Sequence, residues 1–417
     1  MKILFLSDNF PPEVNAPASR TFDHCKEWVG AGHQVTVITC APNFPNGKVL
    51  SGYRNRIWQK SVIDGIVVIR VWSYITANEG FIKRILDYVS YMCSATLASL
   101  FVRKVDVVVG TSPQFFTVCA AYMVASFKRV PWIFELRDIW PESIRAVGAM
   151  KNSFVLDFLE KIELFLYKKS SAIISVTNSF REILAGRGVD VAKVHVVTNG
   201  VDITRFYPRP KSVGLLERHG LEGKFVTGYI GTHGMAHGLE TVLAAASRMK
   251  AVQGGEVFRF LLLGDGARKA ALVDKARSEG LDNVIFVDTV TKEEVTGYWS
   301  ILDVSIIHLK KSPLFTTVIP SKMFECMGMS IPILHGVKGE SASIIENEQV
   351  GITFEPENVD ELCAGLWSLY NDREMYERFK QNGPLASKHY DRTYLAGRML
   401  GILECIFKER NKRSVSG

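Results

Sequence analysis

The stretch from Pro320 to Leu334 contains the side chains whose types and spacing point most directly to chemistry. It follows a short apolar segment, and Pro320 with Ser321 is a typical start of a helix, which places Ser321 at the N-cap. Lys322 and Glu325 then fall in the first turn. Because a helix N-terminus offers unpaired N–H groups and a positive dipole end, it binds phosphate, and Lys322 would add a positive charge.

Glu325 indicates what would accompany the phosphate. Its carboxylate could accept hydrogen bonds from two hydroxyls of a ribose or another sugar. A phosphate and a sugar recognised side by side suggest a nucleotide-sugar site. The alternative is a short core helix with ordinary charges in its first turn.

Two glycine-rich loops in the second half of the chain could complete such a site. In the loop 231–238, glycines allow the backbone to approach a diphosphate, and two histidines could donate hydrogen bonds to it. In the loop 264–269, Arg268 and Lys269 fall in a first helical turn, where cations are unfavourable unless an anion lies nearby. Either loop could instead simply turn the chain, because glycine is an ordinary turn residue.

Two polar segments in the first half are candidates for binding a second substrate. Residues 135–142 follow a buried strand, and there Asp138 could accept a hydrogen bond from an acceptor hydroxyl while Trp140 could cover a sugar ring. The loop that begins at Asp8 leads to a helix start and could also meet a substrate. An Arg–Asp ion pair and a stiff connecting loop are the structural alternatives.

The hydrophobic pattern predicts the framework that positions these loops. Apolar strands alternate with helical patterns in two runs, which is typical of parallel sheets covered by helices on both faces. Strands are predicted at 2–6, 34–39, 105–109, 132–135, 172–176 and 194–197, and at 225–230, 258–263, 284–287, 304–307, 331–334 and 351–354. Residues 61–71 predict a hairpin with Asp64-Gly65 at its turn.

The expected fold class is α/β, with two Rossmann-like doubly wound domains that bind ligand in the cleft between them. The turn residues and prolines that follow Asn199 mark the linker. We expect domains at 1–200 and 201–388, and a C-terminal helix within 389–417 that crosses back to the first domain.

Composition narrows the class of protein further. The 417 residues are 47% hydrophobic and 22% charged, which suits a globular chain of two domains. Seven scattered cysteines form no Cys-x-x-Cys pair, and no Asp-x-Asp occurs, so neither a disulfide framework nor a metal site is expected. Acidic and basic residues nearly balance at a net charge of +7, which argues against nucleic acid as a partner.

The expected location is the cytoplasm, because no signal peptide precedes the first strand. Two amphipathic helices, at about 85–102 and 153–167, are flanked by lysine and arginine. Basic and apolar side chains together can hold a protein on an anionic membrane face. The alternative is that both helices only cover a sheet and carry their charges at solvated ends.

Taken together, the chain resembles the family 4 retaining glycosyltransferases of the GT-B superfold over nearly its whole length. The resemblance rests on residues 8–12, 32–35, 199–202, 264–266 and 321–325. Arg-Asp-x-Trp-Pro at 137–141 and Pro-Ser-Lys at 320–322 are similar to a subgroup that builds bacterial surface polysaccharides. Within it, transferases for N-acetyl-L-fucosamine in O-antigen or capsule assembly look similar.

The resemblance implies roles for individual residues. Asp138, Lys322 and Glu325 would act in catalysis, with Glu325 on the donor ribose. The donor-binding set is Gly231, Thr232, His233, Gly264, Asp265, Gly266, Arg268, Lys269, Ser321, Lys322 and Glu325. The acceptor-binding set is Asn15, Arg20, Arg137, Asp138 and Trp140. No cofactor or metal is implied.

The implied substrates are a nucleotide-diphosphate sugar, linked to UDP, and a polyprenyl-diphosphate-linked glycan at the cytoplasmic face of the inner membrane. The leaving phosphate would take the acceptor proton in a front-face displacement that retains the anomeric configuration. Charge that develops on the diphosphate must then be neutralised.

Two departures from the family pattern affect this interpretation. Thr317 stands where the family has the first of two glutamates eight residues apart. The usual arginine and lysine of the first glycine loop are replaced around Thr232, His233 and His237, so that Arg268, Lys269 and Lys322 are the cations left to neutralise a diphosphate. A GT-B sugar-nucleotide 2-epimerase and a nucleotide-sugar binding protein without turnover are the alternatives.

Overall fold

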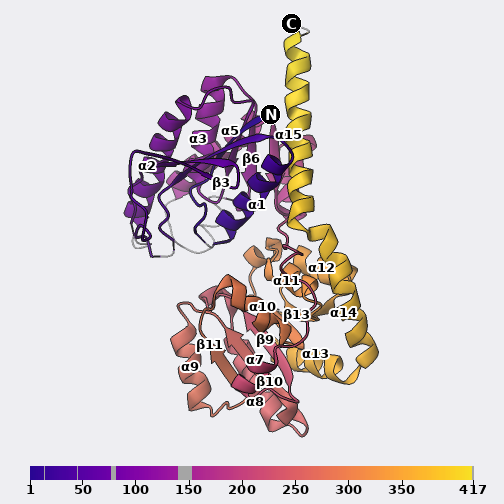
Figure 1. Ribbon diagram of the computed structural model, residues 1–417. Helices are drawn as coiled ribbons and strands as arrows, with labels where there is room; N and C mark the ends of the chain where they lie inside the picture. Colours follow the sequence, from indigo (N-terminus) through magenta and orange to yellow (C-terminus); the bar gives the residue numbers. More distant parts are fainter. Residues whose placement is uncertain (14, 45, 77–80, 140–152, 416–417) are drawn as a thin grey trace. The chain divides into compact units, whose positions relative to one another are not determined.

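The computed structural model describes residues 1–13, 15–44, 46–76, 81–139 and 153–415. The chain divides into two compact units (Figure 1). Unit 1 comprises Met1–Thr198 and Arg392–Gly417, and unit 2 comprises Asn199–Asp391. The C-terminal residues are therefore part of the same compact unit as the N-terminal ones.

The described part of unit 1 contains a sheet in the order β3-β4-β2-β1-β5-β6-β7-β8. All neighbouring strands are parallel except β3 and β4, which form an antiparallel hairpin. The strands are β1 (Lys2–Leu6), β2 (Gln34–Cys40), β3 (Trp58–Ile63), β4 (Ile66–Val71), β5 (Val107–Thr111), β6 (Trp132–Leu136), β7 (Ala172–Ser175) and β8 (Val194–Val196).

Helices cover both faces of this sheet, because its strands are apolar on both sides. On one face, α1 (Ala16–Gly30) and α15 (Arg392–Val415) pack together, and the indole of Trp28 donates to the Ala396 carbonyl at 2.9 Å. The other face is covered by α2 (Phe81–Leu100), α3 (Phe115–Lys128), α5 (Ser153–Lys169) and α6 (Asn178–Gly186).

Unit 2 contains a fully parallel sheet in the order β11-β10-β9-β12-β13-β14. Its strands are β9 (Phe225–Ile230), β10 (Phe258–Leu263), β11 (Val284–Val287), β12 (Val304–His308), β13 (Ile333–Gly336) and β14 (Gly351–Thr353). Its helices are α7 (Val213–His219), α8 (Glu240–Ala251), α9 (Lys269–Ser278), α10 (Lys292–Ser300), α11 (Lys322–Gly328), α12 (Glu340–Asn347), α13 (Val359–Asn371) and α14 (Arg373–Ser387). The 3-10 segment η4 (Pro313–Thr317) follows β12.

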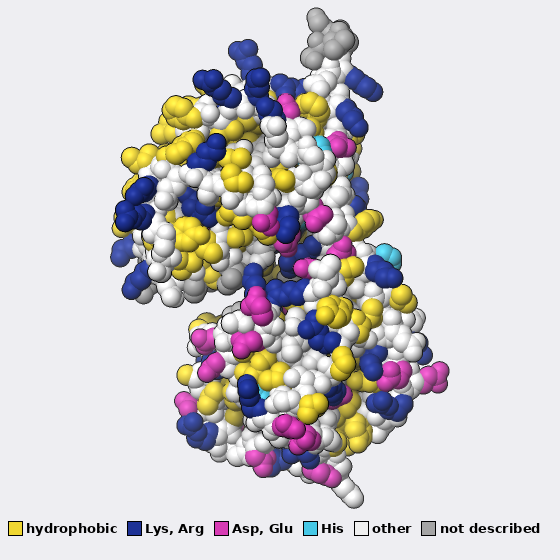
Figure 2. All heavy atoms as spheres, in the orientation of Figure 1, with side chains coloured by type: hydrophobic (Ala, Val, Ile, Leu, Met, Phe, Trp, Pro, Cys, Tyr) yellow, Lys and Arg dark blue, Asp and Glu magenta, His cyan; other side chains and the backbone are white. Residues whose placement is uncertain are grey.

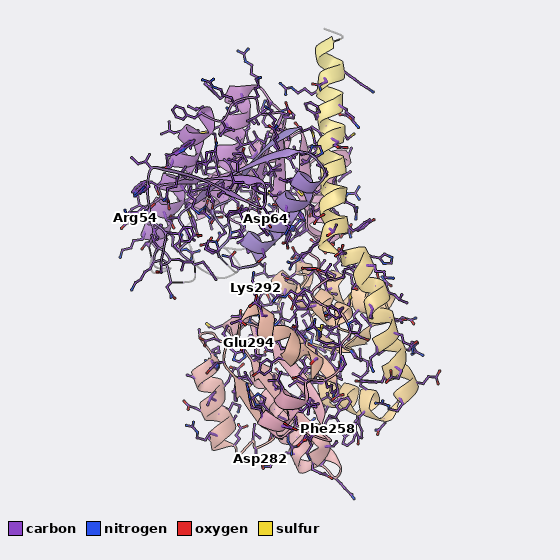
Figure 3. The ribbon with its side chains drawn as sticks, viewed as in Figure 1. Arg54, Asp64, Phe258, Asp282, Lys292 and Glu294 are labelled. Atoms are coloured by element: carbon purple, nitrogen blue, oxygen red, sulfur yellow. The ribbon has the colours of Figure 1, made fainter. Side chains whose placement is uncertain are left out.

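Two apolar cores enclose the sheet of unit 2. One includes Phe258, labelled in Figure 3, and buried residues of α8, α9 and α13. The other includes Trp299 of α10 and Met323 of α11. The segment that follows β12 is thus packed against the sheet, which gives the side chains it carries a fixed position.

The predicted doubly wound α/β class is confirmed by these two sheets, and so is the hairpin of unit 1. Asp64 (Figure 3) and Gly65 both have positive φ, at 46° and 80°, as a tight two-residue hairpin turn requires. The predicted strand at 331–334 begins later, at Ile333. The N–H of Ile331 bonds back to the Cys326 carbonyl and closes the end of α11, so the strand cannot start there.

Within the described ranges, no helix combines the length and the hydrophobicity that a membrane-spanning segment requires.

Candidate functional site

A pocket of about 390 Å³ lies at the carboxyl ends of β9 and β12 in unit 2. Three segments form it: the loop after β9, the end of β12, and the chain that enters α11. The lining residues are Ile230, Gly231, Thr232, His237, Ile307, His308, Leu309, Val318, Pro320, Ser321, Lys322 and Glu325. The structure thus brings five of the predicted donor-binding residues to one pocket, namely Gly231, Thr232, Ser321, Lys322 and Glu325.

The side chain of Lys322 is the most unusual feature of this pocket. Its ammonium nitrogen is buried and has no hydrogen-bond partner among the described residues. It lies 3.8 Å from the centre of the Tyr229 ring, whose face attracts a cation. Burial lowers the pKa of Lys322 to about 8, against the opposing influence of Cys326 and Glu325. A buried cation without a hydrogen-bonding partner is costly, so an anionic ligand would stabilise this arrangement.

Gly231 makes room for that ammonium group. A side chain at this position would place its Cβ 2.5 Å from Lys322 Nζ, and the backbone φ of +148° disfavours any residue other than glycine. The glycine is therefore required by the neighbouring lysine as well as by the path of the chain.

The second glycine loop supports the first rather than lining the pocket. Gly264 packs so closely on the first loop that an added Cβ would lie 1.9 Å from the Gly231 carbonyl oxygen. The N–H of His233 donates to the Asp265 carbonyl at 2.8 Å, and the Arg268 N–H donates to the His233 carbonyl at 2.9 Å. Gly266 likewise lies against the His233 backbone. These contacts fix the path of the pocket-lining loop.

The two cations of that second loop are held by neighbouring carboxylates. Arg268 forms an ion pair with Glu240 at 2.6 Å. Lys269 pairs with Asp288 and also donates to the Gly264 carbonyl at 2.8 Å. Neither residue lines the pocket. Of the three cations that the sequence offered for a diphosphate, Lys322 is therefore the one that the pocket contains.

Ser321 directly precedes α11, as predicted for its N-cap residue, but its side chain does not cap the helix. Ser321 already has helical φ and ψ of −60° and −26°, and its side chain makes no capping hydrogen bond. The reason is the preceding turn, because the Met323 N–H bonds to the Pro320 carbonyl at 3.1 Å. Since α11 is also only seven residues long, charge recognition here depends on side chains more than on the helix end.

Thr317, which replaces the first glutamate of the family pair, belongs to η4. Its hydroxyl donates to the Leu314 carbonyl at 3.0 Å, within that turn. It does not line the pocket around Lys322.

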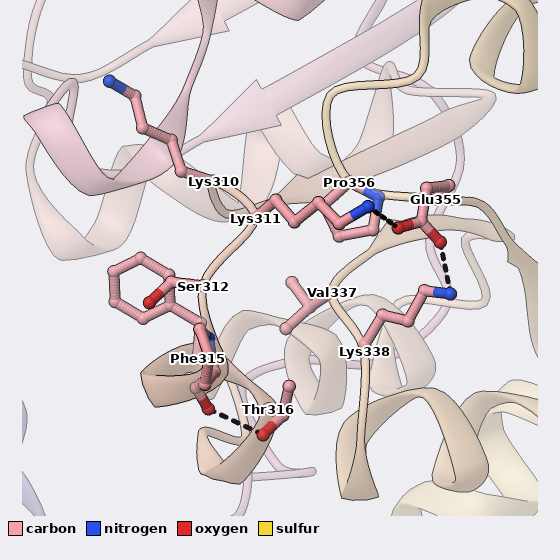
Figure 4. A pocket seen from close by; sticks show the side chains of 10 residues that line it. Lys310, Lys311, Ser312, Phe315, Thr316, Val337, Lys338, Glu355 and Pro356 are labelled. Carbon is pink, nitrogen blue, oxygen red and sulfur yellow. Dashed lines mark hydrogen bonds and ion pairs between the residues drawn. The ribbon is translucent and has the colours of Figure 1, made fainter.

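A second pocket, of about 510 Å³, is lined by the segment that follows β12 and by residues that follow β13 and β14 (Figure 4). Its apolar lining includes Phe315 and Val337. Lys311 and Lys338 both pair with Glu355, at 2.9 Å for Lys311, whereas Lys310 extends away from that carboxylate. Residues 310–316 thus form part of the wall of the second pocket and lead directly into the first.

Unit 1 holds the predicted acceptor-binding residues that the structure describes. Asn15 caps α1 by accepting from the Ala18 N–H at 2.9 Å. Arg20 is buried and pairs with the buried Glu135 at 3.2 Å. Both residues therefore have clear structural roles.

Arg137 and Asp138 lie at the end of β6, where both backbone N–H groups donate to the Ser112 hydroxyl, at 2.8 and 3.3 Å. Burial, together with Arg20, lowers the pKa of Arg137. Trp140 lies outside the described residues. Asp138 belongs to unit 1, whereas the other two predicted catalytic residues, Lys322 and Glu325, belong to unit 2.

Asp87 of unit 1 is a buried ionisable group that the sequence pattern did not single out, whereas Asp8 begins one of the candidate substrate loops. Burial raises the pKa of Asp87 to about 7, with a further contribution from Asp8. Burial also raises the pKa of Asp8 to about 6, although a hydrogen bond with Asn9 opposes the shift. The sequence feature that could have identified Asp87 is its position as a single carboxylate within the apolar run of α2. Among the described residues, no group of three or more His, Cys, Asp or Glu side chains is arranged to hold a metal ion.

Comparisons with known proteins agree with this geometry. Residues 15–200 match the model of the glycosyl transferase 4-like domain, and residues 216–385 match the model of glycosyl transferases group 1. The fold class that these two units and the pocket define is GT-B. The chain is a group 1 glycosyltransferase, an enzyme of family 4.

Relatives at the level of sequence are distant. The chain is 25% identical over 380 residues to the protein named colanic acid biosynthesis glycosyl transferase WcaI of Escherichia coli K12, covering 88% of this chain and 91% of that one. It is 24% identical over 257 residues to the teichuronic acid biosynthesis protein TuaH of Bacillus subtilis, covering 60% and 62%.

Solved structures share the fold at low sequence identity. Sucrose-phosphate synthase of Thermosynechococcus elongatus superposes with a TM-score of 0.75 at 13% identity, over 98% of this chain and 99% of that one. Anabaena HepE, in complex with UDP-glucose, superposes with a TM-score of 0.71 at 15% identity, over 97% and 100%.

The contact between the two glycine loops predicts a difference between two Gly→Ala variants. Gly264 and Gly280 both have positive φ, but a Cβ at Gly280 would meet nothing within 4 Å. Gly280→Ala should cost about 1 kcal/mol through backbone strain alone. Gly264→Ala should lower the free energy of unfolding of unit 2 by roughly 3 kcal/mol or more, because its Cβ also collides with the Gly231 carbonyl. Urea unfolding measures both, and equal losses would contradict the contact.

The raised pKa of Asp87 predicts that Asp87→Asn stabilises the protein in a pH-dependent way. The folded protein disfavours the ionised carboxylate, so the wild type loses stability as the pH rises through about 7. The variant should melt at a higher temperature than the wild type at about pH 8, and the difference should shrink toward about pH 4. Thermal unfolding across this range is the measurement, with the exposed Glu182→Gln as control. A constant difference at all pH values would contradict the titration.

Proposed function

We propose that unit 2 binds a nucleotide sugar with its diphosphate at Lys322 and its ribose at Glu325. The single observation that carries this proposal is the buried ammonium group of Lys322, which has no hydrogen-bond partner among the described residues. Glu325 lies three residues further along the same helix and lines the same pocket, where it could accept two ribose hydroxyls. The complexes of HepE with UDP and UDP-glucose support UDP as the nucleotide.

The reaction that we propose is sugar transfer with retention of configuration, by front-face displacement. As the bond between sugar and diphosphate breaks, negative charge develops on the leaving phosphate, and Lys322 would stabilise it. The leaving phosphate takes the proton of the acceptor hydroxyl, which then bonds to the sugar. Asp138 of unit 1 is proposed to orient that hydroxyl.

The acceptor that we propose is a lipid-linked glycan in the assembly of a surface polysaccharide, with N-acetyl-L-fucosamine as the transferred sugar. The likeness to proteins named for colanic acid and teichuronic acid biosynthesis supports a surface polysaccharide. The similarity of Arg-Asp-x-Trp-Pro and Pro-Ser-Lys to N-acetyl-L-fucosamine transferases supports the sugar.

The outer surface of unit 1 supports contact with a membrane. Large apolar side chains are exposed on α2, α3 and α5, including Leu97 at 62%, Phe127 at 70% and Phe158 at 57%. Phe101, just after α2, is 76% exposed. Exposed basic residues stand among them: Lys83, Arg84, Arg103, Lys104, Arg129, Lys161, Lys168 and Lys169. Figure 2 shows hydrophobic and basic side chains mixed over the part of unit 1 that includes α2. This basic apolar face fits the anionic cytoplasmic face of the inner membrane.

The donor site predicts that Lys322→Met weakens nucleotide binding. UDP should raise the melting temperature of the wild type without added metal, because a ligand that binds only the folded state stabilises it. Loss of a charge-assisted contact should weaken binding by roughly 10- to 100-fold, as titration calorimetry with UDP would show. Lys311→Met removes the same charge from the second pocket and is the matched control.

Activity assays complete this test. Glu325→Gln should lose transfer of sugar from its UDP conjugate to a polyprenyl-diphosphate-linked glycan, and a panel of UDP sugars that includes N-acetyl-L-fucosamine identifies the donor. Unchanged UDP binding in Lys322→Met would contradict the proposed site. Conversion of the nucleotide sugar to its epimer without any acceptor would favour an epimerase instead.

The membrane surface predicts that Phe101→Ser with Phe127→Ser reduces binding to vesicles. Two exposed phenylalanines that enter the lipid interface should contribute enough that the double variant binds at least about tenfold more weakly. Cosedimentation with vesicles of phosphatidylglycerol and phosphatidylethanolamine measures this. Leu385→Ser, which removes an exposed apolar side chain of unit 2, is the control. Equal binding by both variants would exclude this face as the contact.

A further inference from the structure

His237 is a second unusual residue of the pocket that we propose as the donor site. The residue lines the pocket together with Lys322 and Thr232. Its Nδ1 atom is buried and has no hydrogen-bond partner among the described residues. That atom lies beside Gly234, where an added Cβ would approach it to 3.2 Å. The pocket therefore contains a second buried polar nitrogen that a ligand could satisfy.

The backbone of His237 is held in place by His308 of β12. The Nδ1 of His308 bonds to the His237 carbonyl at 2.7 Å, and its Nε2 bonds to the Glu357 N–H at 2.9 Å. Because a carbonyl can only accept and an N–H can only donate, His308 carries its proton on Nδ1 and is neutral. The Lys310 N–H also donates to the Ala236 carbonyl at 2.8 Å. The loop is thus tied to the end of β12, and His308 acts as a positioning residue.

The ionisable groups that face His237 favour its neutral form in the empty pocket. They are Lys322 from α11, His233 from the same loop, His308 from β12, and the ring of Tyr229 from β9, at 6.0 Å between ring centres. Burial, followed by Lys322, lowers the pKa of His237 to about 4. His233, which also faces Lys269 and Asp265, has its pKa lowered to about 4 by burial. Both rings are therefore neutral near pH 7 without ligand.

A charge count shows what a bound diphosphate would change. The charged side chains that line the pocket are Lys322 and Glu325, and their charges offset each other. Arg268 and Lys269 are held by Glu240 and Asp288 outside it. The diphosphate of a nucleotide sugar brings two negative charges, so the pocket with neutral histidines supplies no net compensation. Negative charge next to His237 favours the protonated ring.

We propose that His237 is a ligand of the donor diphosphate and binds it as an imidazolium, so that a proton is taken up from solvent with each donor molecule bound. This inference rests on the proposed donor site. In contrast to a lysine or an arginine, this ring would become charged only when the donor is present.

Proton uptake has a measurable consequence for affinity. Between the pKa of the free and of the occupied ring, donor affinity falls up to tenfold for each unit of rising pH. A nucleotide sugar is the better probe, because free UDP has a terminal phosphate that titrates near about pH 6. Because the pKa of Lys322 is lowered to about 8, the comparison is made between about pH 6 and pH 7, where Lys322 stays protonated.

The experiment is titration calorimetry of the full chain with UDP-glucose over this pH range, in buffers of different ionisation enthalpy. The wild type should take up a fraction of a proton near about pH 7 and bind more weakly as the pH rises. His237→Arg, whose charge is permanent, should bind without uptake and with a flat pH profile. His237→Gln should also be flat, and roughly tenfold weaker at the acidic end of the range.

The possible results distinguish a failure of this inference from a failure of the proposed donor site. Binding of UDP-glucose with no uptake and no pH dependence in the wild type would overturn the inference and leave the donor site standing. Uptake that persists in His237→Gln would overturn the assignment to His237 and point to His233. If UDP-glucose, GDP-glucose and ADP-glucose all fail to bind at every pH, the donor site and the inference both fall.

Discussion

The pocket that we propose as the donor site depends on one constraint, which is that a buried ammonium group has no hydrogen-bonding partner among the described residues. Lys322 lies over the ring of Tyr229, which offers a weakly attractive face but accepts no strong hydrogen bond. Gly231 leaves the space that this ammonium group occupies, and Gly264 must lack a side chain so that the Gly231 backbone can lie where it does. The two glycines thus leave room for the ammonium group of Lys322, and an anionic ligand would stabilise this buried charge.

The two glycine loops have different roles in the pocket. The loop after β9 lines the pocket, and the loop after β10 holds it in place through backbone hydrogen bonds to His233. Arg268 and Lys269 fall where a phosphate-binding site would be expected, yet Glu240 and Asp288 engage them. A site with one lysine and neutral histidines results. Under the proposed proton uptake, such a site would respond to the charge of its ligand, whereas a site built from arginine and lysine carries its charge permanently.

Unit 1 contains buried charged side chains, and its surface carries exposed large apolar side chains. Arg20 and Glu135 are buried as a pair, and burial together with Asp8 raises the pKa of Asp87. Buried groups of this kind hold the chain in place at the ends of β1 and β6, and they are shielded from solvent. On α2, α3 and α5, exposed phenylalanines and lysines form the basic apolar face that we propose to contact a lipid surface.

The sequence by itself determined the two doubly wound sheets and the hairpin at Asp64-Gly65. It also singled out the segment from Pro320 to Glu325, which lines the pocket that we propose as the donor site. These features depend on apolar periodicity and turn chemistry, which are local. Only the tertiary structure decided which cation enters the pocket, because Arg268, Lys269 and Lys322 look alike until their carboxylate neighbours are known. It also decided that the Ser321 side chain makes no capping hydrogen bond to α11, and that Asp8 contributes to the raised pKa of Asp87. Partners far apart in the chain set these outcomes, and burial and ion pairing are properties of the folded neighbourhood rather than of the local sequence.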